Sequence, residues 1–310
     1  MVAADRSSAR ATRPVGVVTR GTTGPNRLRR MDRGLVHVGE SLLRGAARPP
    51  RQPAFPAPGK DRGPLESRRP GTRAVPAPPL VVDLGYGAAA TTTVELRRRL
   101  AVVRPDVEVV GVEIDPERVA AAQPYASPPE LTFVRGGFDL TCVDRAPALV
   151  RAANVLRQYD EDEVAGAWRL LQDALAPGGL ILEGTCDEIG RRSTWIVLDA
   201  DGPRSLTISV AFGAIERPSD VAERLPKALI HRNVPGERVH TYLRALDAAW
   251  DRAAPLASYG RRQRFVAACA DLRAQGWPVL DGPRRWRLGE IGVAWEAVRP
   301  TRTHPDSRPI

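Results

Sequence analysis

The chain has 310 residues and a formal net charge of +10, from 46 basic and 36 acidic side chains. This length is enough for one large domain or two small ones. The three cysteines are far apart and form no C-x-x-C pair, so neither a disulfide framework nor a zinc site is expected. The four histidines lack metal-ligand spacing, so we expect no metal. The sequence has no run of about 18 apolar residues and no secretory signal core, which predicts a cytoplasmic protein without a membrane span.

The positive charge is concentrated near the N-terminus. Residues 1–80 hold 16 basic and 5 acidic residues, a net charge of +11, which leaves 30 basic and 31 acidic residues for the rest. All basic residues except Lys60 and Lys227 are arginine. Two interpretations stay open: an arginine-rich arm that binds nucleic acid, and a solvated tail in a sequence biased toward arginine.

The N-terminal quarter divides into three parts. We expect a disordered tail over residues 1–15 and a helix over about 26–44, where Leu28, Met31 and Leu35 follow helical spacing. Residues 47–79 contain ten prolines and are interpreted as an extended linker. The predicted organisation is therefore an N-terminal segment over 1–79 with a candidate lid in 16–46, a domain over 80–299, and a disordered tail over 300–310.

From Leu80 onward, apolar strands alternate with helical stretches, the pattern of a parallel doubly wound sheet. Strands are expected at residues 80–84, 107–114, 131–135, 149–153 and 180–183, and helices at about 92–103, from 116, and at about 160–175. A hairpin over 194–198 and 205–212, three helical stretches between 219 and 275, and a last antiparallel strand over 291–298 follow.

Two strand ends carry the residues that suggest a ligand site. The first strand continues into Asp83-Leu84-Gly85-Tyr86-Gly87, whose glycines allow a tight turn and a close backbone approach. Thr91, Thr92 and Thr93 are candidate N-caps for the next helix. The second strand ends at Glu113. Carboxyl ends of parallel strands meet at one edge of the sheet, where ligands bind.

These residues resemble the class I S-adenosylmethionine (SAM)-dependent methyltransferases. Asp83-Leu84-Gly85-Tyr86-Gly87 stands where that family has its acidic-x-Gly-x-Gly motif, and Glu113 stands where the family has the acid that holds the ribose hydroxyls. Ala176-Pro177-Gly178-Gly179 before another strand adds to the likeness, which extends to about Asp187. The resemblance implies an α/β fold with a mostly parallel seven-stranded Rossmann-like sheet, SAM as the cofactor, and a C-terminal helical insertion that builds the substrate pocket.

The resemblance also implies roles for individual residues. The cofactor-binding set would be Asp83, Gly85, Tyr86, Gly87, Glu113, Ile114, Phe138 and Asn154. Ile114 and Phe138 would contact the adenine ring. Many family members have an Asp where this chain has Gly137, so adenine recognition departs from the family pattern, and Asp139 is a candidate substitute.

Catalytic residues are harder to identify, because methyl transfer mainly needs the two reactants held in line. Asn154 at the end of the fourth strand and Glu183 at the end of the fifth are the candidates, Glu183 as a general base. Asp187 and Glu188 lie near the same rim.

We therefore predict an enzyme that moves a methyl group from SAM to a small-molecule acceptor by in-line displacement, in an unknown oligomeric state. Two alternatives stay open. Gly85-x-Gly87-x-x-Ala90 also fits the fingerprint of NAD(P)-dependent oxidoreductases, although Glu113 lies 28 residues beyond Gly85, farther than the roughly 20 expected. The other alternative is a non-catalytic module that binds nucleic acid through the arginine-rich segment.

Overall fold

The structure is a computed structural model that describes residues 14–18, 23–45 and 77–301. Most of the expected N-terminal tail, residues 47–76 of the predicted linker and the end of the predicted C-terminal tail lie outside the described residues. No helix in the described ranges combines the length and the hydropathy needed to cross a bilayer.

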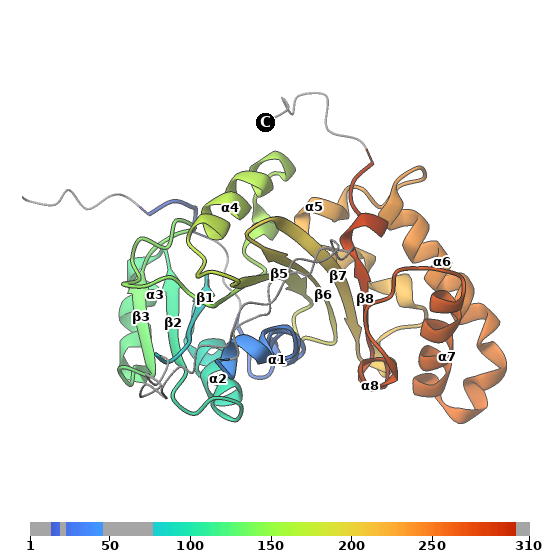
Figure 1. Cartoon of the computed structure of the whole chain (residues 1–310), viewed down its shortest axis with the longest axis horizontal. Coiled ribbons are helices and arrows are strands. Elements are labelled where there is room, and N and C mark those ends of the chain that lie inside the picture. The colour runs from blue at the N-terminus through green and yellow to red at the C-terminus, as the bar shows by residue number, and fades with distance from the viewer. Residues whose placement is uncertain (1–13, 19–22, 46–76, 302–310) are drawn as a thin grey trace, which may run out of the picture.

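A single eight-stranded sheet runs through the described domain in the order β3-β2-β1-β4-β5-β6-β7-β8 (Figure 1). The strands are β1 Leu80–Leu84, β2 Glu108–Glu113, β3 Leu131–Arg135, β4 Leu149–Ala153, β5 Leu180–Cys186, β6 Arg192–Asp199, β7 Gly202–Val210 and β8 Glu290–Ala294. Strands β1 to β5 pair in parallel, and β5 to β8 pair antiparallel. The expected α/β class with a largely parallel sheet is confirmed.

The prediction of seven strands is wrong. Both strands of the expected hairpin and the last strand join the same sheet, which brings the number to eight. The chain passes from β5 to β6 through residues 187–191 alone. A parallel crossover needs a dozen or more residues, so β6 must return antiparallel beside β5.

Helices cover both faces of the sheet. They are α1 Arg29–Leu43, α2 Thr91–Ala101, α3 Pro116–Ala122, α4 Glu161–Asp173, α5 Lys227–Ile230, α6 Arg238–Arg252, α7 Arg261–Ala274 and α8 Pro283–Trp286. Side chains of α1 and α2 share one buried cluster with one face of the strands, and those of α4, α6 and α7 share a second cluster with the other face. Figure 1 shows α1 and α2 below the sheet and α4 above it.

Helix starts follow the local sequence in two of three cases. Asp115 caps α3 by accepting a hydrogen bond from the Glu117 amide, and Asp160 forms a capping box with Glu163 at α4. The expectation of a threonine N-cap at α2 is wrong. Ala90 occupies the cap position, and Thr93 donates its hydroxyl to Asp83 instead.

The expected N-terminal helix is present as α1, and it packs against the sheet. Met31, Leu35 and Leu43 are fully buried in the cluster that contains β1 and β5 side chains. Arg30 of this helix donates to the Ser209 hydroxyl and to the Leu288 carbonyl. The lid role and the domain boundary at residue 79 remain predictions.

The strand order reverses direction between β1 and β4, because β2 and β3 lie on one side of β1 and the later strands on the other. Open α/β sheets bind ligands in the crevice outside such a switch point. Helices α5 to α8 lie between β7 and β8 in the sequence, and their expected role in building a substrate pocket remains a prediction.

Candidate functional site

The turn after β1 has the conformation that its glycines permit. Gly85 and Gly87 have φ angles of +64° and +86°, which favour glycine over other residues. The Gly85 amide donates to the Val112 carbonyl at 2.7 Å and ties the turn to β2. A side chain at Gly85 would come within 2.7 Å of Val155. Glycine at position 85 is therefore required both by the backbone conformation and by the packing against Val155.

Glu113 lies buried at the carboxyl end of β2, beside this turn. Its Oε2 accepts a hydrogen bond from the Gly87 amide at 2.9 Å, and its Oε1 accepts from the amides of Ile114 at 3.0 Å and Asp115 at 3.3 Å. An ionised carboxylate has about four acceptor positions. At least one position therefore remains for a hydroxyl of a ligand, and the weak Asp115 bond could yield another.

A small, mostly apolar cavity adjoins Glu113. We call it the apolar cavity. Its walls include Leu84, Gly85, Ile114, Phe138, Val155 and Tyr159. Phe138 packs edge-on against Tyr159, with ring centroids 5.4 Å apart. Flat apolar walls with one carboxylate at the side suit a nucleoside, whose base is flat and whose ribose carries two hydroxyls.

The N-terminal segment 14–18 forms one wall of the apolar cavity. The Val15 carbonyl accepts from the Phe138 amide at 3.0 Å, and the Val17 amide donates to the Tyr159 hydroxyl at 2.7 Å. A side chain at Gly137 would overlap the backbone of Val15. This packing explains why the chain has glycine where an Asp was expected from the resemblance, since only glycine leaves room for the segment.

A second, larger hollow opens to solvent on the other side of the glycine turn. We call it the polar cavity. Its lining includes Tyr86, Asn154, Cys186 and the arginines Arg27, Arg157 and Arg224. Gly85 lines both cavities. An elongated ligand can therefore lie across Gly85 with one end in each cavity.

Asp83 belongs to a buried ion-pair network. Its Oδ1 accepts from Arg151 Nε at 2.8 Å, and its Oδ2 accepts from Arg151 Nη2 at 2.6 Å and from the Thr93 hydroxyl at 2.7 Å. Arg151 also pairs with Asp32 of α1, which in turn pairs with Arg99 of α2. Asp83 reaches the polar cavity, but its carboxylate is held mainly by Arg151, and its expected role toward a cofactor ammonium remains a prediction.

Two members of the network, Arg151 and Asp32, have raised pKa values. Burial opposes the charge of Arg151, but the carboxylates of Asp83 and Asp32 outweigh burial and raise the pKa of Arg151. Burial raises the pKa of Asp32, against the opposing effect of Arg151 and Arg99. Sequence analysis missed Arg151, although an arginine within an apolar strand was a usable signal, because a buried charge needs a partner.

Asn154 connects the ends of β4 and β5. Its Oδ1 accepts from the Cys186 amide at 2.9 Å, and its Nδ2 approaches Cys186 Sγ at 3.4 Å. Its φ angle of +61° turns the chain toward Leu156–Gln158, a 3₁₀ turn whose Arg157 lines the polar cavity. An amide side chain cannot act as a base at neutral pH, so this geometry favours a positioning role.

Glu183 lies away from both cavities. Within β5, Cys186 faces the α1 side, whereas Glu183 alternates onto the α4 side and is almost fully buried. Burial raises its pKa to about 8, partly countered by the nearby Trp168 indole, which does not reach good hydrogen-bond geometry. The structure therefore does not bring Glu183 to the site where a general base would act.

The other predicted cofactor residues lie around the two cavities. Ile114 and Phe138 line the apolar cavity, and Tyr86 and Gly87 line the polar cavity. The Tyr86 hydroxyl donates to the Arg118 carbonyl at 3.3 Å, and burial raises its pKa. No group of three His, Cys, Asp or Glu side chains within the described residues could hold a metal ion.

No protein-family model matches the sequence, and no curated protein matches it. Solved structures match part of the chain. Mitomycin 7-O-methyltransferase is 18% identical over 35% of this chain and 31% of its own, with a TM-score of 0.30. Human N-acetylserotonin methyltransferase in complex with SAM is 26% identical over 36% of this chain and 32% of its own, with a TM-score of 0.29.

A third match is magnesium protoporphyrin IX methyltransferase from Synechocystis PCC 6803, at 18% identity over 35% of this chain and 47% of its own, with a TM-score of 0.29. The chain thus spans between a third and a half of these three proteins. TM-scores this low do not establish a shared function, so we base the functional proposal on the residues described above.

Proposed function

We propose that the protein is a SAM-dependent methyltransferase that transfers a methyl group to a small-molecule acceptor. One observation carries the proposal: a buried carboxylate, Glu113, lies between an apolar cavity and a glycine turn that opens into a polar cavity. These features lie at the carboxyl ends of β1 and β2, next to the switch point of the sheet.

The shape of SAM fits this arrangement. Its nucleoside matches the apolar cavity, where Ile114 and Phe138 provide flat apolar contacts and Glu113 has acceptor capacity for a ribose hydroxyl. Its charged amino-acid end matches the polar cavity beyond Gly85. The polar cavity is the larger of the two, so the acceptor is placed on the polar side.

SAM supplies a methyl group on a positively charged sulfur. A lone pair of the acceptor forms the new bond to the methyl carbon while the carbon–sulfur bond breaks. The electron pair of the broken bond stays on the sulfur and neutralises its charge. The protein then needs to orient the two partners and to exclude water. Gly85 and Gly87 permit the close approach, and Asn154 holds the ends of β4 and β5 together at the cavity. Within the candidate lid over 16–46, Gly16 and Val17 line the apolar cavity and Arg27 and Leu28 line the polar cavity, which supports the lid proposal.

Isothermal titration calorimetry of the full chain with S-adenosylhomocysteine, and separately with NAD⁺, tests the proposal. We expect binding by the parent, a loss of about 10- to 100-fold for Glu113→Ala because a hydrogen bond to a charged group is removed, and little binding of NAD⁺. The matched control is Glu108→Ala, at the far end of β2, where the glutamate pairs with Arg145 outside both cavities.

Binding of NAD⁺ without binding of S-adenosylhomocysteine would favour the alternative of an NAD(P)-dependent oxidoreductase and refute the proposal. So would a folded Glu113→Ala variant that binds S-adenosylhomocysteine as tightly as the parent. Circular dichroism of both variants shows whether they are folded.

A further inference from the structure

Three arginines from three separate parts of the chain line the polar cavity: Arg27 before α1, Arg157 after β4, and Arg224 at the end of the 3₁₀ helix Pro218–Arg224. The acids in the lining are Asp83 and Glu188. Asp83 is already neutralised by the fully buried Arg151. Positive charge therefore exceeds negative charge on the walls of this cavity.

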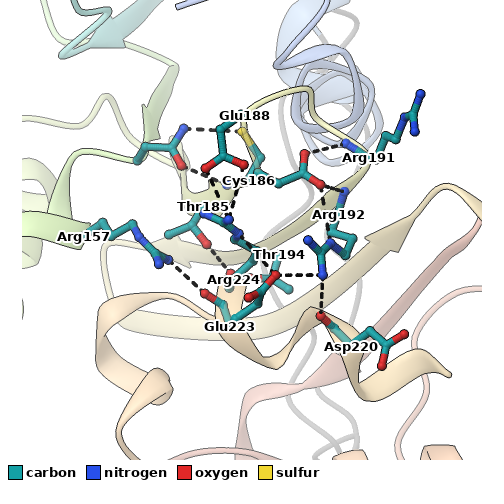
Figure 2. A network of polar contacts seen from close by, with 12 residues as sticks. Arg157, Thr185, Cys186, Glu188, Arg191, Arg192, Thr194, Asp220, Glu223 and Arg224 are labelled. Carbon is teal, nitrogen blue, oxygen red and sulfur yellow. Dashed lines mark hydrogen bonds and ion pairs between the residues drawn. The ribbon is translucent and has the colours of Figure 1, made fainter. Parts of the chain in front are cut away.

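Arg157 and Arg224 lie close to each other, and Figure 2 shows both near Glu223 and Glu188. Arg157 donates to the Glu223 backbone carbonyl at 3.0 Å, and the carboxylates of Glu223 and Glu188 offset part of its charge. Burial, and then the like charge of Arg224, lowers the pKa of Arg157. Two neighbouring guanidinium groups repel each other unless an anion lies between or beside them.

The acidic partners of Arg224 are weak ones. Its Nη2 meets the Glu188 carboxylate at 3.3 and 3.4 Å, and that glutamate side chain is 74% exposed. Its Nε is buried, makes no hydrogen bond among the described residues, and has the Glu223 carboxylate, 55% exposed, at 3.8 Å. Ion pairs with exposed carboxylates contribute little, so an incoming anion can replace Glu188 at small cost.

The backbone holds Arg224 at this place. Its carbonyl accepts hydrogen bonds from the hydroxyls of Thr185 in β5 and Thr194 in β6 (Figure 2). The central sheet thus holds the Arg224 backbone beside the cavity independently of the Glu188 contact. A substitution of the Arg224 side chain leaves these two hydrogen bonds in place.

We propose that Arg157 and Arg224 form an anion subsite that anchors the acceptor, and that the acceptor is a small molecule carrying a carboxylate or phosphate group. This inference rests on the proposed methyltransferase function. Guanidinium groups recognise both anions through paired hydrogen bonds. Leu28 and Tyr86 in the same lining offer apolar contact for the body of the molecule. The anion would orient the acceptor, while a separate atom of it receives the methyl group.

The test titrates the full chain, with and without saturating S-adenosylhomocysteine, with benzoate, phenyl phosphate and the uncharged benzamide at constant ionic strength. Ligand-observed NMR measures the affinities. We expect both anions, or one of them, to bind and benzamide not to bind, and the preferred anion identifies the group. Arg157→Gln and Arg224→Gln should each weaken the anion about 10- to 100-fold.

Arg191→Gln is the matched control, because Arg191 is exposed and its side chain points away from the cluster in Figure 2. It removes the same charge nearby and should leave the anion affinity unchanged. An equal loss in this control, or no binding of either anion by the parent, would overturn the subsite.

The affinity of the same two variants for S-adenosylhomocysteine distinguishes an acceptor subsite from a cofactor subsite. If Arg157→Gln and Arg224→Gln weaken S-adenosylhomocysteine as much as the anion, the pair serves the cofactor's own carboxylate and the acceptor proposal is wrong. If the parent fails to bind S-adenosylhomocysteine at all, the methyltransferase function fails, and arginine-dependent binding of the anion would then stand as a property of the cavity alone.

Discussion

Replacing Glu183 with glutamine should stabilise the protein above pH 5 without reducing cofactor binding. Glu183 is buried on β5, and neither carboxylate oxygen has a hydrogen bond among the described residues. Burial raises its pKa from 4.5 to about 8. In the folded protein the group therefore keeps its proton up to about pH 8, whereas in the unfolded chain it loses the proton near pH 4.5.

The sign and size of the effect follow from this difference. A group whose pKa is raised on folding contributes most to stability below pH 4.5, and that contribution is lost as pH rises to about 8. The two pKa values differ by 8 − 4.5 = 3.5, and each pKa unit corresponds to about 1.36 kcal/mol. The free energy of unfolding of the parent should therefore fall by about 5 kcal/mol from this group alone.

Glutamine has nearly the same shape and does not titrate, so Glu183→Gln should remove this fall. Urea unfolding at several pH values between 4 and 9 gives the difference between parent and variant at each pH, in which the contributions of other groups cancel. A difference that stays constant across this range would refute the reasoning. A variant that loses methyl transfer while it still binds S-adenosylhomocysteine would restore Glu183 as a candidate base.

Three further predictions concern the network, the turn and the N-terminal segment. Arg151→Met should lower the free energy of unfolding by about 3–5 kcal/mol, because it leaves the buried carboxylate of Asp83 without a charged partner and that of Asp32 with Arg99 alone. The triple variant that also carries Asp32→Asn and Asp83→Asn should recover part of the loss. No recovery in urea unfolding would contradict this. Gly85→Ala should weaken S-adenosylhomocysteine binding, because it places a Cβ 2.7 Å from Val155 in the wall of the apolar cavity. The control Gly178→Ala has a similar φ of +76° and no atom within 4 Å of the added Cβ, so it should only destabilise the fold slightly. Calorimetry showing equal affinities for the two variants would contradict this. A chain that begins at Thr23 loses the contacts of Val15 and Val17 at the apolar cavity and should release S-adenosylhomocysteine faster in stopped-flow measurements. An unchanged release rate would refute a lid role for the residues before Thr23.

Local sequence was sufficient for the site's core, because neighbouring residues build it. The β1 strand, the turn at Gly85 and the acid at the end of β2 follow from short-range spacing, and parallel pairing brings the ends of β1 and β2 together. The antiparallel return of β6 beside β5 follows from the short connection over residues 187–191, whereas the seven strands implied by the family resemblance are one too few.

Residues far apart in the chain determine the rest, and only the tertiary structure brings them together. Val15 closes the cavity beside Gly137, Asp32 of α1 reaches Arg151 of β4, and Arg224 lies near Arg157 at the polar cavity. The tertiary structure also decides which helix packs over the face of the sheet where Glu183 lies. Such contacts depend on where each connection returns the chain, whereas spacing along the sequence reports only on neighbours within a strand or a helical turn.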